Sequence, residues 1–211
     1  MCGIIGYKGK RNGCEVVLNG LKDLEYRGYD SWGIAALNGG IKIVKNVGKI
    51  GDVSLDDLGL EKTNLSVGQT RWATHGGVTI ENAHPHFSQN ESFALVQNGI
   101  VENFQELRGE LKAQGHQFKT ETDTEVIVRL IEDNLKEISD LKGAVIRAFK
   151  RLKGRNAIVL IENETKRIIA ARNGSPLILG VGEDEFILAS DPSPLLKYTH
   201  KVIFLDDNEL V

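Results

Sequence analysis

The alternation of apolar and polar residues predicts strands in the first half of the chain, interrupted by one helix. Val16, Val17, Leu21 and Leu24 lie on one stripe of a helix spanning 13–25. The Asn38-Gly39-Gly40 turn between two apolar runs predicts a hairpin. The strands expected in this half lie at residues 2–7, 34–37, 41–47, 65–69 and 92–97.

Helical patterns fill the middle of the chain. Leu107 and Leu111 mark a first helix, which Gly115 ends. Residues 122–125, Thr-Asp-Thr-Glu, resemble a capping box that opens a second helix continuing through Leu135. A third helix is expected over residues 140–152, with Gly154 as its stop. The strands predicted after it lie at 157–161, 167–171, 177–181, 185–189 and 201–205.

Strands and helices are therefore grouped along the chain rather than alternated. Grouping favours antiparallel sheets with helices packed outside them, an α+β fold, over a doubly wound parallel sheet. No repeat, low-complexity run or interdomain linker interrupts the pattern, so residues 1–211 are expected to form one domain. The irregular segment 70–90 is long for a compact domain, and such loops are usually functional.

Composition is that of an ordinary globular protein. Hydrophobic residues make up 41% and charged residues 26% of 211 residues, and the formal net charge is -3. This balance indicates neither nucleic acid nor a membrane as a partner. There are two cysteines, too few for a disulfide framework, and we find neither a signal peptide nor an apolar run long enough to span a bilayer. We therefore expect a cytoplasmic protein.

Cys2 follows the initiator methionine directly. Removal of Met1 would leave one residue that carries both a thiol and a free α-amine, which is the amino-terminal form of a nucleophile–base pair. The ordinary pKa values, about 8.5 for a thiol and about 7.7–8.0 for an α-amine, allow the amine to take the thiol proton near neutral pH. The structural alternative is a small buried residue at the start of a strand, and Gly3 favours the catalytic interpretation because it allows close approach.

Two further motifs follow predicted strands. In the segment 68–77, Arg71 offers a planar fork suited to a carboxylate and Thr74 adds a hydroxyl, although an isolated arginine would more often be structural. Asn98-Gly99 is commonly a simple turn. Its functional interpretation is an oxyanion hole, with an amide N–H from Asn98 and a backbone N–H from Gly99.

Asp123 completes a possible amino-acid site. An acidic residue in a first helical turn is normally a partner of the helix dipole, but it can also accept a hydrogen bond from a ligand ammonium group. A thiol, an oxyanion pair, an arginine and an aspartate together describe a pocket for an amino acid with a side-chain amide, namely glutamine or asparagine. His84 and His86 lack further ligands at a suitable spacing, so we expect no metal, and Cys14 sits in a helical pattern typical of packing.

These motifs resemble the class II glutamine amidotransferases, whose nucleophile is an amino-terminal cysteine, over essentially the whole chain. Within that family, Tyr-Arg-Gly-Tyr-Asp-Ser and Glu-Thr-Asp-Thr-Glu are similar to the glutaminase domains of the glucosamine-6-phosphate synthase (glutamine–fructose-6-phosphate amidotransferase) branch. The stretches that carry the resemblance are 1–6, 24–31, 71–76, 82–86, 98–103, 120–125, 174–177 and 189–191.

The resemblance implies a four-layer αββα Ntn-hydrolase sandwich and hydrolysis of L-glutamine through a γ-glutamyl thioester, with no cofactor. It implies that Cys2 attacks the amide and that Asn98 and Gly99 form the oxyanion hole. The implied substrate-binding residues are Arg71, Trp72, Thr74, His75 and Asp123, with Gly99 also near the amino group. Arg27 is implied to support the surroundings of the nucleophile, and Trp72 to act as a lid or ammonia gate.

The chain departs from the family pattern in two ways. Gln97 stands where the family often has histidine, and we expect this to tune the site rather than abolish it. The family continues into a sugar-phosphate isomerase (SIS) portion that binds fructose 6-phosphate, whereas this sequence ends at Val211, so an isomerase domain or subunit is the expected partner. Two alternatives stay open: a class II glutaminase subunit that serves another acceptor synthase, and a non-catalytic glutamine sensor.

Overall fold

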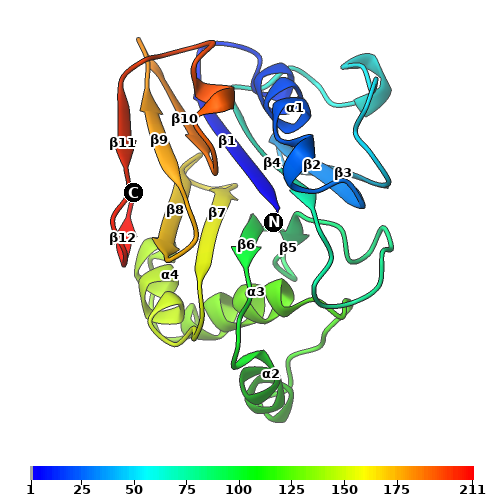
Figure 1. The fold of residues 1–211 in the computed structure, drawn as a ribbon. Helices are drawn as coiled ribbons and strands as arrows, with labels where there is room; N and C mark the ends of the chain where they lie inside the picture. The colour runs from blue at the N-terminus through cyan, green and yellow to red at the C-terminus, as the bar shows by residue number, and fades with distance from the viewer. Residues whose placement is uncertain (1) are drawn as a thin grey trace.

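Two antiparallel sheets form the centre of the molecule (Figure 1). The computed structural model describes residues 2–211, so Met1 lies outside the described residues. The seven-stranded sheet has the order β11 (Val202–Phe204), β9 (Ile178–Val181), β10 (Glu185–Ala189), β1 (Gly3–Gly9), β4 (Leu65–Arg71), β2 (Ser31–Leu37), β3 (Ile41–Val47). The five-stranded sheet has the order β12 (Glu209–Leu210), β8 (Ile168–Asn173), β7 (Asn156–Glu162), β6 (Phe93–Gly99), β5 (His86–Phe87).

Helices cover the outer face of each sheet (Figure 1). The α-helices are α1 (Gly13–Asp23), α2 (Phe104–Ala113), α3 (Asp123–Asn134) and α4 (Leu141–Phe149), and short 3₁₀ turns lie at Glu25–Arg27, Asp56–Leu58 and Ser193–Leu195. Helix α1 packs on the seven-stranded sheet, and α2, α3 and α4 on the five-stranded sheet. Within residues 2–211, no helix has the length and apolarity that crossing a bilayer requires.

Three apolar cores separate the four layers. One core lies between α1 and the first sheet, a second between the two sheets, and a third between the second sheet and α2, α3 and α4. Strand β1 contributes to two of them, because Ile4 faces the second sheet while Ile5 and Tyr7 face α1. The predicted α+β fold with four αββα layers and two antiparallel sheets is therefore confirmed.

The central place of β1 fixes where the chain begins. Strand β1 lies between β10 and β4, with Ile5 opposite Ala189 on one side and Gly68 on the other. The residue that precedes β1 is therefore held at the end of a strand with neighbours on both sides. Figure 1 shows that this end of β1 lies beside the end of β6 in the other sheet.

The start of α3 carries only half of the predicted capping box. The Thr122 hydroxyl accepts a hydrogen bond of 3.3 Å from the backbone N–H of Glu125, as expected for an N-cap. The Glu125 carboxylate, however, accepts the N–H groups of Lys119 and Thr120 and pairs with Arg129. It thereby holds the loop before the helix instead of closing the box.

Several predicted boundaries move in the structure. Strand β2 begins at Ser31, three residues before the predicted 34–37, because Ser31 and Trp32 pair with β4 and are buried. The predicted helix 13–25 ends at Asp23 as an α-helix, and the helix expected over 140–152 ends at Phe149. The two-residue strands β5 and β12 were not predicted, since two residues carry no detectable periodicity.

Glycine at position 33 permits a close backbone approach that positions the segment before β5. A Cβ atom at Gly33 would lie 2.2 Å from the carbonyl oxygen of His84 and 2.9 Å from that of Val44. We expect Gly33→Ala to destabilise the protein by about 1–3 kcal/mol, because two backbone segments would have to move. Thermal or urea unfolding followed by circular dichroism measures this difference.

A second glycine supplies the matched control. Gly109 lies exposed inside α2, and a Cβ atom added there would meet no other atom within 4 Å, so Gly109→Ala is expected to stabilise the protein by about 0.5–1 kcal/mol. Equal effects of the two substitutions would contradict the close approach at Gly33.

Candidate active site

Cys2 is held at the start of β1 by contacts from three other segments. Its Sγ accepts a hydrogen bond of 3.3 Å from the backbone N–H of Trp72. Its carbonyl oxygen accepts the side-chain Nδ2 of Asn98 at 2.9 Å and Nε of Arg27 at 3.1 Å. Burial raises the pKa of the Cys2 thiol above its ordinary value, and the Trp72 N–H opposes this rise. The thiol is therefore protonated near neutral pH unless a base takes its proton.

Asn98 and Gly99 end β6 next to Cys2. The Asn98 side chain is 4% exposed, and its Oδ1 accepts a hydrogen bond of 3.4 Å from Nε2 of Gln69. Gly99 has a φ of 115°, and a Cβ atom there would lie 1.8 Å from the carbonyl oxygen of Arg155. Only glycine fits this position, so the strand can turn away there and leave the neighbourhood of Cys2 open.

The Arg71 guanidinium organises the loop that follows β4. Arg71 is 3% exposed, and it donates to the carbonyl oxygens of His75 at 2.6 Å and Gly77 at 3.1 Å. Asp30 anchors the same loop from the other side by accepting the N–H of Ala73. Trp72 itself is 48% exposed, and the edge of one ring faces Tyr29, with ring centroids 5.4 Å apart.

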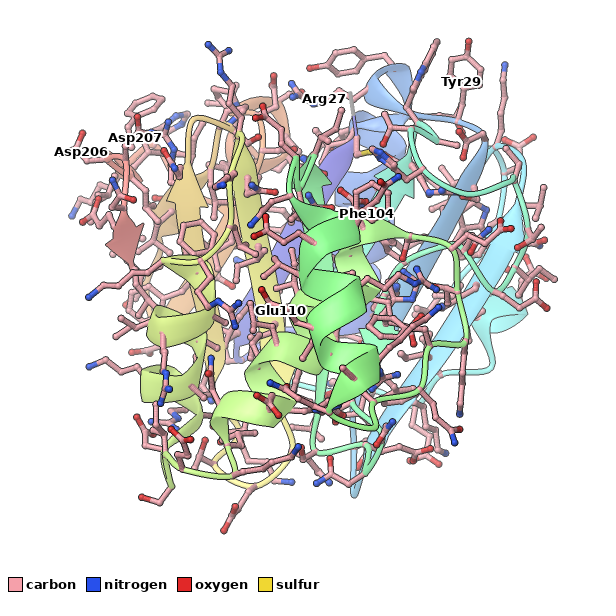
Figure 2. The ribbon with its side chains drawn as sticks, turned by 90° about the horizontal axis from the view of Figure 1, so that it is seen from below. Arg27, Tyr29, Phe104, Glu110, Asp206 and Asp207 are labelled. Atoms are coloured by element: carbon pink, nitrogen blue, oxygen red, sulfur yellow. The ribbon has the colours of Figure 1, made fainter. Side chains whose placement is uncertain are left out.

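Asp123 begins α3 at the inner end of the site. Its Oδ2 accepts the backbone N–H of Val101 at 2.8 Å, and Oδ1 lies 4.0 Å from Nδ1 of His75. Burial raises the pKa of Asp123, while this hydrogen bond and His75 oppose the rise. The His75 ring packs edge-on against Phe104, which Figure 2 shows at the first turn of α2.

Two cavities meet at Cys2, and together they contain every predicted site residue. The outer cavity has a volume of about 330 Å³, and the inner one of about 10 Å³. The predicted residues that line the outer cavity are Cys2, Arg27, Trp72, Thr74, Asn98 and Gly99. Those that line the inner cavity are Cys2, Arg71, Trp72, Thr74, His75, Gly99 and Asp123. A separate cavity of about 430 Å³ between β3 and α3 contains none of them.

Two aspartates that were not predicted as site residues, Asp191 and Asp30, hold the segments around Cys2 in place. Asp191 accepts Nη1 of Arg27 at 3.4 Å and the hydroxyl of Tyr26 at 2.8 Å, so it holds Arg27 against Cys2. Asp30 holds the loop after Arg71, as described above. Both aspartates lie in stretches that carry the family resemblance, but no spacing rule connects them with residues so distant in sequence.

Gln97, the departure noted in the sequence, is fixed on both sides of its amide. The Thr124 hydroxyl donates to its Oε1 at 2.7 Å, and its Nε2 donates to Oδ1 of Asn156 at 2.9 Å. Gln97 also lines the inner cavity. It therefore flanks the site as expected, and its tuning effect stays a prediction.

His84 and His86 form a buried pair of adjacent rings. Their ring centroids are 4.7 Å apart, and Nε2 of His86 lies 3.1 Å from the Thr122 hydroxyl. Within residues 2–211, no three His, Cys, Asp or Glu side chains gather closely enough to hold a metal ion. Burial lowers the pKa of both histidines well below 6.5, so both rings are neutral.

A family model described as a glutamine amidotransferase domain matches residues 71–197, more than half of the chain. The chain belongs to this family. The match begins at Arg71 and includes Asn98, Gly99 and Asp123, whereas Cys2 and Arg27 lie before it.

Curated relatives give the same result over the whole chain. The chain is 49% identical to the glutamine–fructose-6-phosphate aminotransferase (isomerizing) of Aquifex aeolicus over 213 residues, and 47% identical to that of Thermus thermophilus over 216 residues. Each alignment covers 100% of this chain, but only 36% and 35% of the respective relative. The chain therefore spans about a third of the length of these relatives.

A solved structure supports the fold. The glutamine phosphoribosylpyrophosphate amidotransferase from B. subtilis superposes with a TM-score of 0.87 at 28% sequence identity. The superposition covers 99% of this chain and 46% of that protein. The four-layer arrangement is therefore shared with another glutamine amidotransferase.

The two neutral histidines give the protein a predictable dependence of stability on pH. In the unfolded chain their pKa is near 6.5, above the folded value, so unfolding takes up protons below this pH. We expect the free energy of unfolding to be highest above pH 6.5 and to fall between pH 6.5 and 5.5. The limiting slope is about 1.4 kcal/mol per pH unit for each histidine. Urea unfolding at a series of pH values measures it.

His86→Gln separates this effect from other titrations. The substitution removes one of the two histidines and keeps a partner for Thr122, so the slope between pH 6.5 and 5.5 should fall by about half. A wild-type stability that stays flat down to pH 5.5 would contradict the neutral state of the pair.

Proposed function

We propose that this chain hydrolyses the side-chain amide of L-glutamine to glutamate and ammonia, with Cys2 as the nucleophile. The observation that carries the proposal is the position of the Cys2 sulfur between two sets of groups. On one side lie the donors at the end of β6, and on the other lies the cavity that ends at Arg71 and Asp123. The family supports the reaction class, and these side chains match the parts of glutamine in charge and hydrogen bonding.

The reaction begins with transfer of the thiol proton. The raised pKa of the half-buried Cys2 thiol means that a base is needed. The α-amine released by removal of Met1, which lies outside the described residues, is bonded to the same Cα and serves as that base. Sγ then bonds to the amide carbon. The proton passes to the amide nitrogen as the C–N bond breaks, giving ammonia and a γ-glutamyl thioester. Water cleaves this thioester to glutamate and restores the thiol.

The negative oxygen formed at each attack has donors within reach. Asn98 Nδ2 lies 2.9 Å from the carbonyl oxygen of Cys2, so it is beside the nucleophile before substrate binds. The backbone N–H of Gly99 is the second donor in this proposal. Donors fixed in a buried site stabilise the transition state more than the ground state, which raises kcat.

Binding of the amino-acid end of glutamine requires movement of the loop 72–77. The inner cavity of about 10 Å³ holds roughly one water molecule. The Arg71 donors are directed at loop carbonyl oxygens, and a substrate carboxylate would replace His75 O and Gly77 O as their acceptor. Asp123 would pair with the α-ammonium group, and the exposed Trp72 would close over the substrate.

The destination of the ammonia is proposed from the relatives. Their names describe transfer to fructose 6-phosphate with isomerisation. We propose that this chain supplies ammonia for glucosamine 6-phosphate synthesis, together with a sugar-phosphate isomerase domain or subunit in the cytoplasm. The identity of 47–49% over the whole chain supports this acceptor over others.

The first test is labelling by a glutamine analogue that carries a chloroketone in place of the amide. We expect one adduct, located by mass spectrometry on residue 2 of a chain that lacks Met1, and loss of glutaminase activity in Cys2→Ala. Cys14→Ala is the matched control. Cys14 is buried and its pKa is raised to about 11, so its removal should leave labelling and turnover unchanged. Full turnover by a chain that keeps Met1 would refute the mechanism.

Asp123→Asn tests the ammonium anchor. The substitution preserves shape and an oxygen acceptor for the Val101 N–H, but it removes the charge. We expect KM for glutamine to rise about 10–100-fold, because one charge-assisted hydrogen bond is lost, and kcat to change less. Steady-state glutamate release measures both constants. A fall in kcat at constant KM would place Asp123 in the chemistry instead of in binding.

A further inference from the structure

Gln69 connects the two sheets directly behind the reactive centre. It lies on β4 in the seven-stranded sheet, and its side chain is completely buried. Its Nε2 donates to the backbone oxygen of Gln97 and, at 3.4 Å, to Oδ1 of Asn98, both on β6 in the other sheet. The side chain therefore crosses the core between the sheets to reach the residue beside Cys2.

This contact and the one to the carbonyl oxygen of Cys2 together determine which way the Asn98 amide faces. The oxygen and nitrogen of an asparagine amide have almost the same shape, so only hydrogen-bond partners distinguish the two orientations. The Gln69 N–H group selects the orientation in which Oδ1 points back toward β4. Nδ2 then points to the carbonyl oxygen of Cys2, 2.9 Å away. In the reverse orientation, an oxygen would face that carbonyl and any oxyanion formed beside it.

The orientation of Gln69 is itself forced. A reversed Gln69 amide would place its oxygen against the two oxygens of Gln97 and Asn98. In the observed orientation, Oε1 of Gln69 is buried and has no hydrogen-bond partner among residues 2–211. A buried oxygen without a partner is unfavourable, and an apolar side chain would fill the same space without that penalty. A polar residue that departs from the local packing rule in this way points to a functional constraint.

We infer that Gln69 is a positioning residue, which holds the Asn98 amide with its N–H donor toward the oxyanion. The inference rests on the proposed glutaminase function. Gln69 touches neither cavity at Cys2, so it acts only through Asn98. Its effect is on the transition state, because the negative oxygen exists only after attack.

Gln69→Met removes the donor and keeps a side chain of similar length. We expect kcat to fall about 10–100-fold and KM for glutamine to stay nearly unchanged. The fall in kcat should not exceed the loss of about 10²–10³-fold that follows complete removal of one oxyanion donor. Alkylation of Cys2 by iodoacetamide needs no oxyanion hole, so its rate should stay at the wild-type value. A variant that is simply misfolded would lose both.

A double-mutant cycle with Asn98→Ala tests the route of the effect. If Gln69 acts through Asn98, Gln69→Met causes no further loss of kcat once Asn98 is alanine. A loss that multiplies with that of Asn98→Ala would overturn the inference, and so would a single variant with wild-type kcat.

Two more variants keep the outcome unambiguous. Gln69→His retains a ring N–H donor and should recover most of the turnover. A histidine variant that folds but is as impaired as Gln69→Met would also refute the inference. If the methionine variant does not fold, the histidine variant decides the question. Asn134→Leu removes a buried amide of α3 that donates to Ala144 O, far from Cys2, and controls for the general cost of such a loss. Inactive wild-type protein would refute the proposed function instead.

Discussion

The hydrogen bond from Asn98 Nδ2 to the carbonyl oxygen of Cys2 joins the two sheets at the point on which the site depends. It exists because the start of β1, the central strand of its sheet, lies beside the end of β6, which is held between β7 and β5 in the other sheet (Figure 1). A core of interlocking apolar side chains fixes the distance between the sheets, with Ile4 from β1 and Val96 from β6 both inside it. The packing of the whole sandwich thus sets the separation of nucleophile and donor.

A second constraint acts on the loop after β4. Arg71 is a buried cation that forms no ion pair with a carboxylate of residues 2–211, and its donors are directed at loop carbonyl oxygens. Carbonyl groups carry partial charge only, so they compensate a buried guanidinium less well than a carboxylate does. In the proposed function, a substrate carboxylate would therefore be a better partner than the loop, and this charge would couple loop opening to ligand binding.

Local pattern predicted most of the fold and the chemical groups of the site. Strand β1 and helices α1, α3 and α4 have clear periodicity. Cys2, Arg71, Asn98 and Asp123 each have a common structural use, and only their combination indicated a site. Partnerships between distant residues were not predictable. Gln69 contacts Asn98, which is 29 positions away, and Asp191 contacts Arg27, which is 164 positions away. Nothing in a single sequence indicates which strand ends meet.

In the proposed mechanism, burial has opposite consequences for forming the Cys2 thiolate and for stabilising the oxyanion. It raises the pKa of the Cys2 thiol, which makes the thiolate harder to form. The same exclusion of water strengthens every hydrogen bond to a negative oxygen formed beside it. The α-amine proposed as the base would offset the first effect without adding a charged side chain to the core. The second effect then depends on the direction in which the Asn98 amide points, and its hydrogen bonds to Gln69 and to the carbonyl oxygen of Cys2 determine that direction.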